Sequence, residues 1–160
     1  SLDGVLIIRP PTHFFDVRGE YIELYNEKLY NESGITVKFV QQDISISKKH
    51  VLRGIHGDNQ TWKLISCLDG SFLLNVVNNN PESYNYRRSL TFCMTKEYQV
   101  LIPPMYGNGH LVLTYSAIFH YQQSTYYDRS TQFTIAWNDP LYDLYWPIKN
   151  PIVSERDRGI

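Results

Sequence analysis

The chain has 160 residues, of which 42% are hydrophobic and 19% are charged, a balance that excludes a disordered protein. Its Lys+Arg 15 against Asp+Glu 16 leave a net charge of -1, so the composition lacks the basic excess of a nucleic-acid-binding protein. The longest apolar runs are too short to span a bilayer. We expect one globular domain over residues 1–160.

The cysteine content and the first residues favour a reducing compartment. Cys67 and Cys93 are the only cysteines, and two thiols cannot form a disulfide scaffold or a zinc finger. The first residues also lack the charged and apolar regions of a secretory signal peptide. We therefore expect a cytoplasmic protein with no nucleic-acid or membrane partner.

Most of the chain alternates apolar and polar residues with period 2, which predicts strands. The predicted strands, in chain order, are residues 4–8, 21–25, 35–40, 62–68, 71–77, 90–93, 99–102, 111–115, 118–122 and 133–137. Asp69-Gly70 separates two of them and is a strong hairpin signal. The one good helix candidate is 25–33, ended by Gly34. Strands at this spacing favour an antiparallel sandwich or barrel.

Residue types suited to chemistry concentrate in Arg53-Gly54-Ile55-His56-Gly57-Asp58. Arginine suits phosphate recognition, histidine suits proton transfer near neutral pH, and glycines let a ligand approach the backbone. A strand end with a surface arginine explains the same residues equally well. In a regular strand Arg53 and His56 would point to opposite faces, unless Gly54 bends the strand or the two contact different parts of a long ligand.

The spacing of the histidines gives no indication of a metal. The five histidines are His13, His50, His56, His110 and His120. No two of them have the H-x-H or H-E-x-x-H spacing that places two imidazoles on one ion. We expect no metal and no other cofactor.

The motif Arg53-Gly54-Ile55-His56, followed by Lys63-Leu64, resembles the R-G-L-H … K-L core of the dTDP-4-dehydrorhamnose 3,5-epimerase family. Further segments match motifs of that family in the same order: Asp16-Val17-Arg18-Gly19 with Glu23, Phe39-Val40-Gln41, residues 47–52, Ile102-Pro103, Tyr121 with Tyr126-Tyr127, Trp137-Asn138-Asp139, Trp146-Pro147 and Ser154-Glu155-Arg156-Asp157. Each match alone is weak, and their common order makes the resemblance strong.

The resemblance implies an all-β fold, an antiparallel double-stranded β-helix (a cupin or jelly-roll barrel) with one short helix and no bound metal. It implies an isomerase that inverts C3 and/or C5 of a nucleotide-linked 4-keto sugar through an enolate, in the biosynthesis of bacterial surface polysaccharide. It further implies a homodimer in which Arg18 and Glu23 reach into the partner's active site.

The resemblance also assigns roles to individual residues. Its catalytic residues are His56 as the base, Asp157 as its carboxylate partner, Lys63 as the cation beside the C4 oxygen, and Tyr121 as the acid on the opposite face. Asp139 and Asp143 lie in the same C-terminal region and remain alternatives to Asp157. The predicted substrate contacts are Arg53 on the phosphates, Tyr127 or Tyr126 at the nucleotide, and Arg18, Glu23, Gln41, Asp58, Asn108, His110 and Ser154.

Several departures from the family pattern bear on the substrate. The family's A-H-G-F is G-N-G-H here, so Asn108 replaces an imidazole and His110 replaces a usually apolar side chain. Gly57 and Asp58 replace an aromatic residue and a glutamine, which predicts more room and a new partner for hydroxyl groups. Leu74 replaces an aspartate that faces the pocket. The pattern is similar to the subgroup that includes epimerases of GDP-linked 4-keto heptoses in capsule pathways, so we expect a GDP- or dTDP-linked 4-keto sugar.

Two alternative functions stay open. A nucleotide-4-keto-sugar 3,4-ketoisomerase resembles R-G-x-H-A-H, and Asp58 at the second histidine position argues against it. A sugar-nucleotide-binding barrel without catalysis is consistent with Asn108 and Leu74, although the four proposed catalytic residues argue against such decay.

Overall fold

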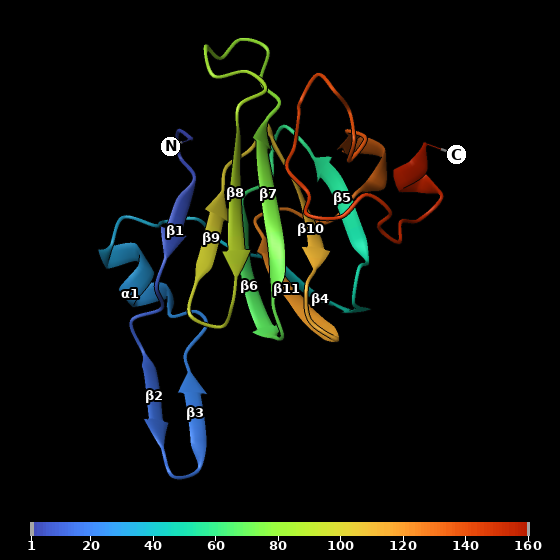
Figure 1. Ribbon diagram of the computed structural model, residues 1–160. Coiled ribbons are helices and arrows are strands. Elements are labelled where there is room, and N and C mark those ends of the chain that lie inside the picture. The colour runs from blue at the N-terminus through green and yellow to red at the C-terminus, as the bar shows by residue number, and fades with distance from the viewer. Residues whose placement is uncertain (1, 160) are drawn as a thin grey trace.

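The protein, described by a computed structural model over residues 2–159, is built from two facing antiparallel sheets (Figure 1). The first five-stranded sheet contains, in spatial order, β1 (Leu6–Ile8), β9 (Gln99–Ile102), β6 (Lys63–Asp69), β11 (Ser116–Gln123) and β4 (Gln41–Lys48). The second contains β12 (Phe133–Thr134), β5 (Leu52–Gly57), β10 (Tyr106–Val112), β7 (Phe72–Asn78) and β8 (Ser89–Met94). This arrangement confirms the predicted all-β fold class.

The remaining elements are short and lie outside the two large sheets. A hairpin of β2 (His13–Asp16) and β3 (Gly19–Ile22) projects away from the body of the molecule (Figure 1). The described part of the chain has one α-helix, α1 (Glu27–Glu32), and two 3-10 turns, Arg129–Thr131 and Arg156–Arg158. Within residues 2–159 no helix is long and apolar enough to cross a membrane.

The apolar core fills the space between the two sheets. Its main cluster includes fully buried side chains from both of them, among them Ile65, Phe72, Leu74, Val100 and Val112. Burial of such side chains is the largest favourable contribution to folding, at about 25 cal/mol per Å² of apolar surface. The core therefore holds the two sheets together.

Local sequence signals found some strands and missed others. The hairpin at Asp69-Gly70 is confirmed, with Gly70 in the left-handed region at φ +70, and the predicted strand 99–102 coincides with β9. The predicted strand 35–40 is wrong, because Ile35 and Phe39 pack in the apolar cluster that holds Tyr30 of α1. The next strand, β4, begins only at Gln41.

The strand β10 was also misplaced, since the prediction was 111–115 and the structure has Tyr106–Val112. Gly107 and Gly109 hide the strand, because glycine is a poor strand former. Their lack of a side chain is required here: a Cβ on Gly107 would lie 2.8 Å from Ile55, and one on Gly109 would lie 2.4 Å from the same side chain. Tertiary packing explains these glycines, and local propensity does not.

The strand β5 departs from regular geometry at Gly54. This residue has φ +115, and a Cβ there would lie 2.6 Å from both the Asn108 carbonyl oxygen and the Gly109 Cα. On the β10 side, Asn108 pairs with His56 and His110 pairs with Arg53, so β5 carries one extra residue. In a regular strand Arg53 and His56 would point to opposite faces. The bulge at Gly54 brings both to the same cavity.

We predict that Gly54→Ala lowers the free energy of unfolding by more than about 3 kcal/mol, because a positive φ and a backbone clash add together. Gly19→Ala is the matched control: Gly19 also has a positive φ, +125, but nothing lies within 4 Å of its Cβ position. It should cost about 1–2 kcal/mol. Urea unfolding of both variants measures the difference, and equal losses would show that the contact with β10 carries no energy.

Candidate active site

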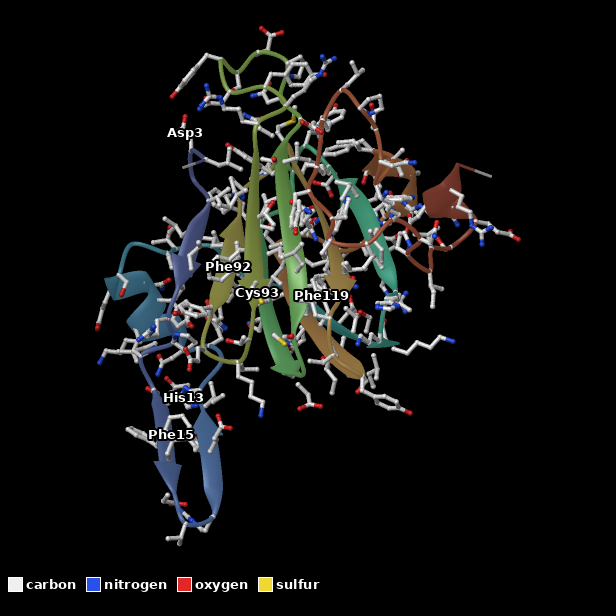
Figure 2. The ribbon with its side chains drawn as sticks, viewed as in Figure 1. Asp3, His13, Phe15, Phe92, Cys93 and Phe119 are labelled. Carbon is white, nitrogen blue, oxygen red and sulfur yellow. The ribbon has the colours of Figure 1, made fainter. Side chains whose placement is uncertain are left out.

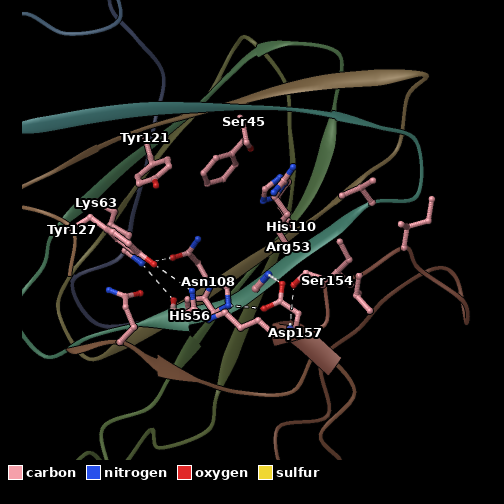
Figure 3. Close-up of a pocket in the computed structure, with 18 of the residues that line it drawn as sticks. Ser45, Arg53, His56, Lys63, Asn108, His110, Tyr121, Tyr127, Ser154 and Asp157 are labelled. Atoms are coloured by element: carbon pink, nitrogen blue, oxygen red, sulfur yellow. Dashed lines mark hydrogen bonds and ion pairs between the residues drawn. The ribbon is translucent and has the colours of Figure 1, made fainter. Parts of the chain in front are cut away.

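A cavity of about 570 Å³ opens between the two sheets and collects most of the predicted site residues (Figure 3). A cavity of this size can hold a nucleotide-sized ligand in part. Its lining includes Arg53, His56, Lys63, Asn108, His110, Tyr121, Tyr127, Ser154 and Asp157. The other predicted site residues, which do not line it, are Arg18, Glu23, Gln41 and Asp58.

His56 and Asp157 form a hydrogen-bonded pair on one wall of the cavity. The distance from His56 Nε2 to Asp157 Oδ1 is 2.6 Å, and the Gly54 N–H donates to the other carboxylate oxygen at 3.0 Å. The pair selects Asp157, and neither Asp139 nor Asp143, as the carboxylate that contacts the imidazole. A carboxylate on one ring nitrogen holds the proton there and leaves the other nitrogen, Nδ1, free to accept one.

Asp157 is ionised at neutral pH although its side chain is only 5% exposed. Burial raises the pKa of this carboxyl, but the hydrogen bonds from His56 and from the Gly54 N–H outweigh it, so the pKa lies below its ordinary value. The carboxylate can therefore stabilise a positive charge on His56. Ser154 contributes to its position, because its hydroxyl accepts a hydrogen bond from the Asp157 N–H at 3.2 Å.

Lys63, at the start of β6, places a buried amine against the cavity. Its Nζ donates to Asn108 Oδ1 at 2.8 Å and to the His56 carbonyl oxygen at 3.4 Å. Within residues 2–159 it forms no ion pair. Burial lowers the pKa of Lys63 to about 8, and the negative charge of Asp58 opposes that shift. The ammonium thus has only neutral direct partners, so an anion that develops in the cavity would meet an unneutralised positive charge.

Tyr121 lies across the cavity from His56 (Figure 3). Tyr121 belongs to β11 in the first sheet and His56 to β5 in the second. Because the two sheets face each other, the phenol lies opposite the imidazole. Burial, together with the negative charge of Asp43, raises the pKa of Tyr121. The phenol is therefore protonated at neutral pH and able to donate its proton.

The structure corrects two interpretations of the substrate side. Asp58 points into its own turn, where its carboxylate accepts hydrogen bonds from the Thr61 hydroxyl, from two backbone N–H groups and from Gln132. Gly57 leaves no room for a larger sugar, because Phe133 and the Tyr106 carbonyl oxygen already fill the space above it. Both residues shape the wall from outside the cavity.

Three further predicted site residues, Gln41, Arg18 and Glu23, do not line the cavity. Gln41 accepts a hydrogen bond from the Tyr127 N–H at 2.9 Å, so it positions Tyr127. Arg18 lies on the β2–β3 hairpin and pairs with Asp16, while Glu23 follows that hairpin. Within one chain these last two residues do not approach the cavity.

The sequence reading missed Ser45 and Gln123, which line the cavity. A signal for Ser45 exists, because β4 has an inverted pattern. Its inward-facing residues are polar, whereas Ile44 and Ile46 are 54% and 65% exposed. A strand with polar residues inside and apolar residues outside is typical of the wall of a wet cavity. Within the part of the chain described, no group of three His, Cys, Asp or Glu side chains could hold a metal.

Comparison with known proteins gives one consistent result. The sequence profile of the dTDP-4-dehydrorhamnose 3,5-epimerase family matches residues 1–160. The enzyme of that name from Salmonella typhimurium is 34% identical over 164 residues, covering 98% of this chain and 89% of the relative. The corresponding enzyme from Methanothermobacter thermautotrophicus is 31% identical, with 99% and 89% covered.

Solved structures agree with these sequence matches. The structure of dTDP-6-deoxy-D-glucose-3,5-epimerase from Legionella pneumophila, in complex with dTDP-4-keto-L-rhamnose, superposes with a TM-score of 0.92. It is 32% identical and the match covers 99% of this chain and 87% of that chain. The dTDP-4-dehydrorhamnose 3,5-epimerase from Bacillus anthracis, with TDP and PPi bound, has the same TM-score of 0.92 at 27% identity, and the match covers 97% of this chain and 91% of that chain.

We predict that the Lys63 amine titrates near pH 8 and that residue 108 controls its titration. In Asn108→Asp a carboxylate replaces the amide 2.8 Å from Nζ, so the pKa of Lys63 should rise toward its ordinary value of 10.5. Asn108→Leu, the uncharged control, should leave the pKa of Lys63 at or below about 8. NMR titration of the lysine Cε resonance measures both, and an unchanged midpoint in the aspartate variant would contradict the contact.

Proposed function

The chain belongs to the dTDP-4-dehydrorhamnose 3,5-epimerase family, and on this premise we propose that His56, Lys63, Tyr121 and Asp157 perform its epimerisation. It is an isomerase that acts on a nucleotide-linked 4-keto sugar. The observation that supports the assignment is the opposition of two proton-transfer groups. A carboxylate-held imidazole and a protonated phenol face each other across one cavity, with a buried amine beside them.

The first step is removal of a proton from a carbon next to the C4 ketone. His56 takes the proton, and the electron pair of the C–H bond forms a C–C double bond while the C4 oxygen becomes negative. Such protons are weakly acidic, so the enolate must be stabilised as it forms. The Lys63 ammonium supplies the positive charge, and Asp157 stabilises the imidazolium that results.

The second step returns a proton to the opposite face of the same carbon. Tyr121 gives its O–H proton to the enolate, the C4 carbonyl forms again, and the configuration is inverted. The tyrosinate regains a proton and the imidazolium loses one to solvent, which restores the enzyme. Because C3 and C5 both flank C4, the same pair serves each carbon in turn when the sugar reorients.

The substrate we propose is a GDP-linked 4-keto heptose, with a dTDP-linked 4-keto sugar as the other candidate. Asn108 and His110 support this choice, because both line the cavity and both are polar departures from the family's A-H-G-F segment. Gly57 and Asp58 no longer contribute, since neither faces the cavity. In this proposal the enzyme works in the cytoplasm and supplies a sugar for capsule or lipopolysaccharide.

We also propose that the working unit is a homodimer. The β2–β3 hairpin carries exposed aromatic residues, with Phe15 69% and Tyr21 64% exposed, and it projects from the body (Figure 2). Exposed apolar side chains on a projecting hairpin favour a protein partner. A second copy would cover them, and the hairpin would carry Arg18 and Glu23 to the partner's cavity, which a single chain cannot do.

Hydrogen exchange in deuterated water tests the two-sided mechanism. His56→Asn should abolish deuterium incorporation at every carbon and lower turnover by at least about 1000-fold, because the base is gone. Tyr121→Phe should still exchange but invert poorly, because only the acid is removed. NMR of recovered nucleotide sugars gives both rates, with binding of the nucleoside diphosphate by calorimetry as the control for folding.

The same experiment separates the alternatives when a panel of GDP-, dTDP- and CDP-linked 4-keto sugars is used. Deuterium at C3 and C5 supports the double epimerase, and deuterium at C3 alone supports the single one. A carbonyl that moves to C3 identifies a ketoisomerase. Tight binding with no exchange on any sugar identifies a binding module and contradicts the proposed function. Normal inversion by Tyr121→Phe would assign the acid to another group.

Complementation between two impaired variants tests the shared site. In a heterodimer of His56→Asn with Arg18→Ala, one cavity has both defects and the other has neither. We expect the heterodimer, purified through two different tags, to recover about half of the wild-type activity. If Arg18 instead serves its own chain, every cavity keeps one defect and the heterodimer gains nothing over the parent variants.

A further inference from the structure

Two polar side chains in the cavity wall lack protein partners. The Ser45 Oγ is fully buried and has no hydrogen-bond partner within residues 2–159. His110 is only 3% exposed as a residue and lines the cavity, and its ring nitrogens have no protein hydrogen-bond partner within residues 2–159. A buried polar group without a partner costs about 1–3 kcal/mol. His120 Nδ1 is also buried without a partner in the described part of the chain, but only Ser45 and His110 line the cavity, where a ligand could supply one.

These two side chains converge on one region of the cavity. Ser45 is the direct partner of Phe119 in the β4–β11 ladder, and the Phe119 ring stacks on His110 with centroids 4.1 Å apart and 5° between the planes. The same Phe119 ring lies 5.4 Å from the ring of Tyr121. Figure 3 shows Ser45 and His110 on one side of the cavity and Lys63 on the other.

The chemistry of this region suits a neutral polar group. Burial and the nearby positive charge of Arg53 lower the pKa of His110 to about 3, so the imidazole is uncharged at neutral pH. A neutral imidazole offers one donor and one acceptor, and a serine hydroxyl offers both. The rings of Phe119 and Phe72 pack against His110, with centroids 4.1 and 5.0 Å away.

A phosphate group would bind at the Arg53 guanidinium and not at Ser45 and His110. Arg53 pairs with His110 in the β5–β10 ladder, but its side chain is exposed. Among the residues that the structure describes, only Ser47 bonds to its guanidinium, through Nε to Oγ at 3.0 Å. The guanidinium thus offers an anion free donors at the accessible edge. The buried, neutral pair behind it matches a hydroxyl group, which both donates and accepts.

We propose that Ser45 and His110 form a hydroxyl-binding subsite that selects among 4-keto sugars. The inference rests on the proposed function, because it takes the C4 carbonyl to lie at Lys63. With the carbonyl there, the candidates for the bound group are the hydroxyl on C2 and the hydroxyl on the substituent of C5. Each can complete the unpaired groups, and a sugar that lacks it leaves them buried and unsatisfied.

The test uses His110→Phe, which keeps an aromatic ring against Phe119 and removes both nitrogens, and Ser45→Ala. The substrates share one nucleotide: a fully hydroxylated 4-keto sugar, its 2-deoxy analogue, and an analogue without the hydroxyl on the C5 substituent. We expect each variant to lower kcat/KM for the full sugar about tenfold, mainly through KM. For the analogue that lacks the bound hydroxyl the loss should be less than about twofold, and that analogue identifies the position.

His120→Phe and Ser116→Ala make the same exchanges at positions outside the cavity and should leave the sugar preference unchanged. Equal losses on all three sugars would overturn the proposal. Weaker binding of the nucleoside diphosphate alone, in both cavity variants, would assign the pair to phosphate and also overturn it.

Failure of the proposed function would be seen separately. If the wild-type protein exchanges no proton on any sugar, the epimerase assignment fails. Calorimetric binding of the same three sugars still measures whether the wild-type protein prefers the hydroxyl and whether the variants lose that preference. A preference absent from the wild-type protein would contradict the subsite whatever the result for exchange.

Discussion

The close approach of β5 and β10 at Gly54 is the contact on which the site depends. Because Gly54 has no side chain, the backbone of Asn108 and Gly109 can pass directly against it. The Gly54 N–H, turned out of the ladder, donates to Asp157, and the extra residue in β5 brings Arg53 and His56 to one cavity. One local irregularity thus connects a strand of the barrel to a turn near the C-terminus.

The electrostatics of the cavity follow from this packing. Asn108, brought opposite His56 in the ladder, accepts the hydrogen bond of the Lys63 ammonium. Burial lowers the pKa of Lys63 to about 8, and the Asn108 amide carries no charge that would neutralise the ammonium. Asp157 differs from Lys63 in that its hydrogen bonds keep its carboxylate ionised despite burial. The Lys63 ammonium is therefore free to stabilise a transient anion, whereas the Asp157 carboxylate is already hydrogen-bonded to His56 and Gly54.

Each of the two sheets carries part of the candidate active site. The first sheet carries Tyr121 and presents a polar inner face through β4, whose isoleucines point outward. The second sheet carries His56 and Arg53. Because the main apolar core lies between the same sheets, the distance between proton acceptor and proton donor is set by core packing and does not depend on a mobile loop.

Much of the fold could be read from local pattern. Period-2 alternation indicated an all-β domain, Asp69-Gly70 marked a hairpin, and 25–33 marked the helix that the structure has at Glu27–Glu32. The prediction omitted β2 and β4, and it failed at 35–40 and at β10. In both cases contacts with distant residues outweighed local propensity, since Phe39 packs near the helix and two glycines make room for Ile55.

The same division applies to the site. The sequence by itself determined which residue types were available, and their order along the chain indicated the family. Only the tertiary structure decided that Asp157 is the carboxylate at His56, that Asp58 turns away, and that Phe133 fills the space above Gly57. The physical reason is that these outcomes depend on side-chain direction and on contacts between residues up to 101 positions apart, which no local pattern contains.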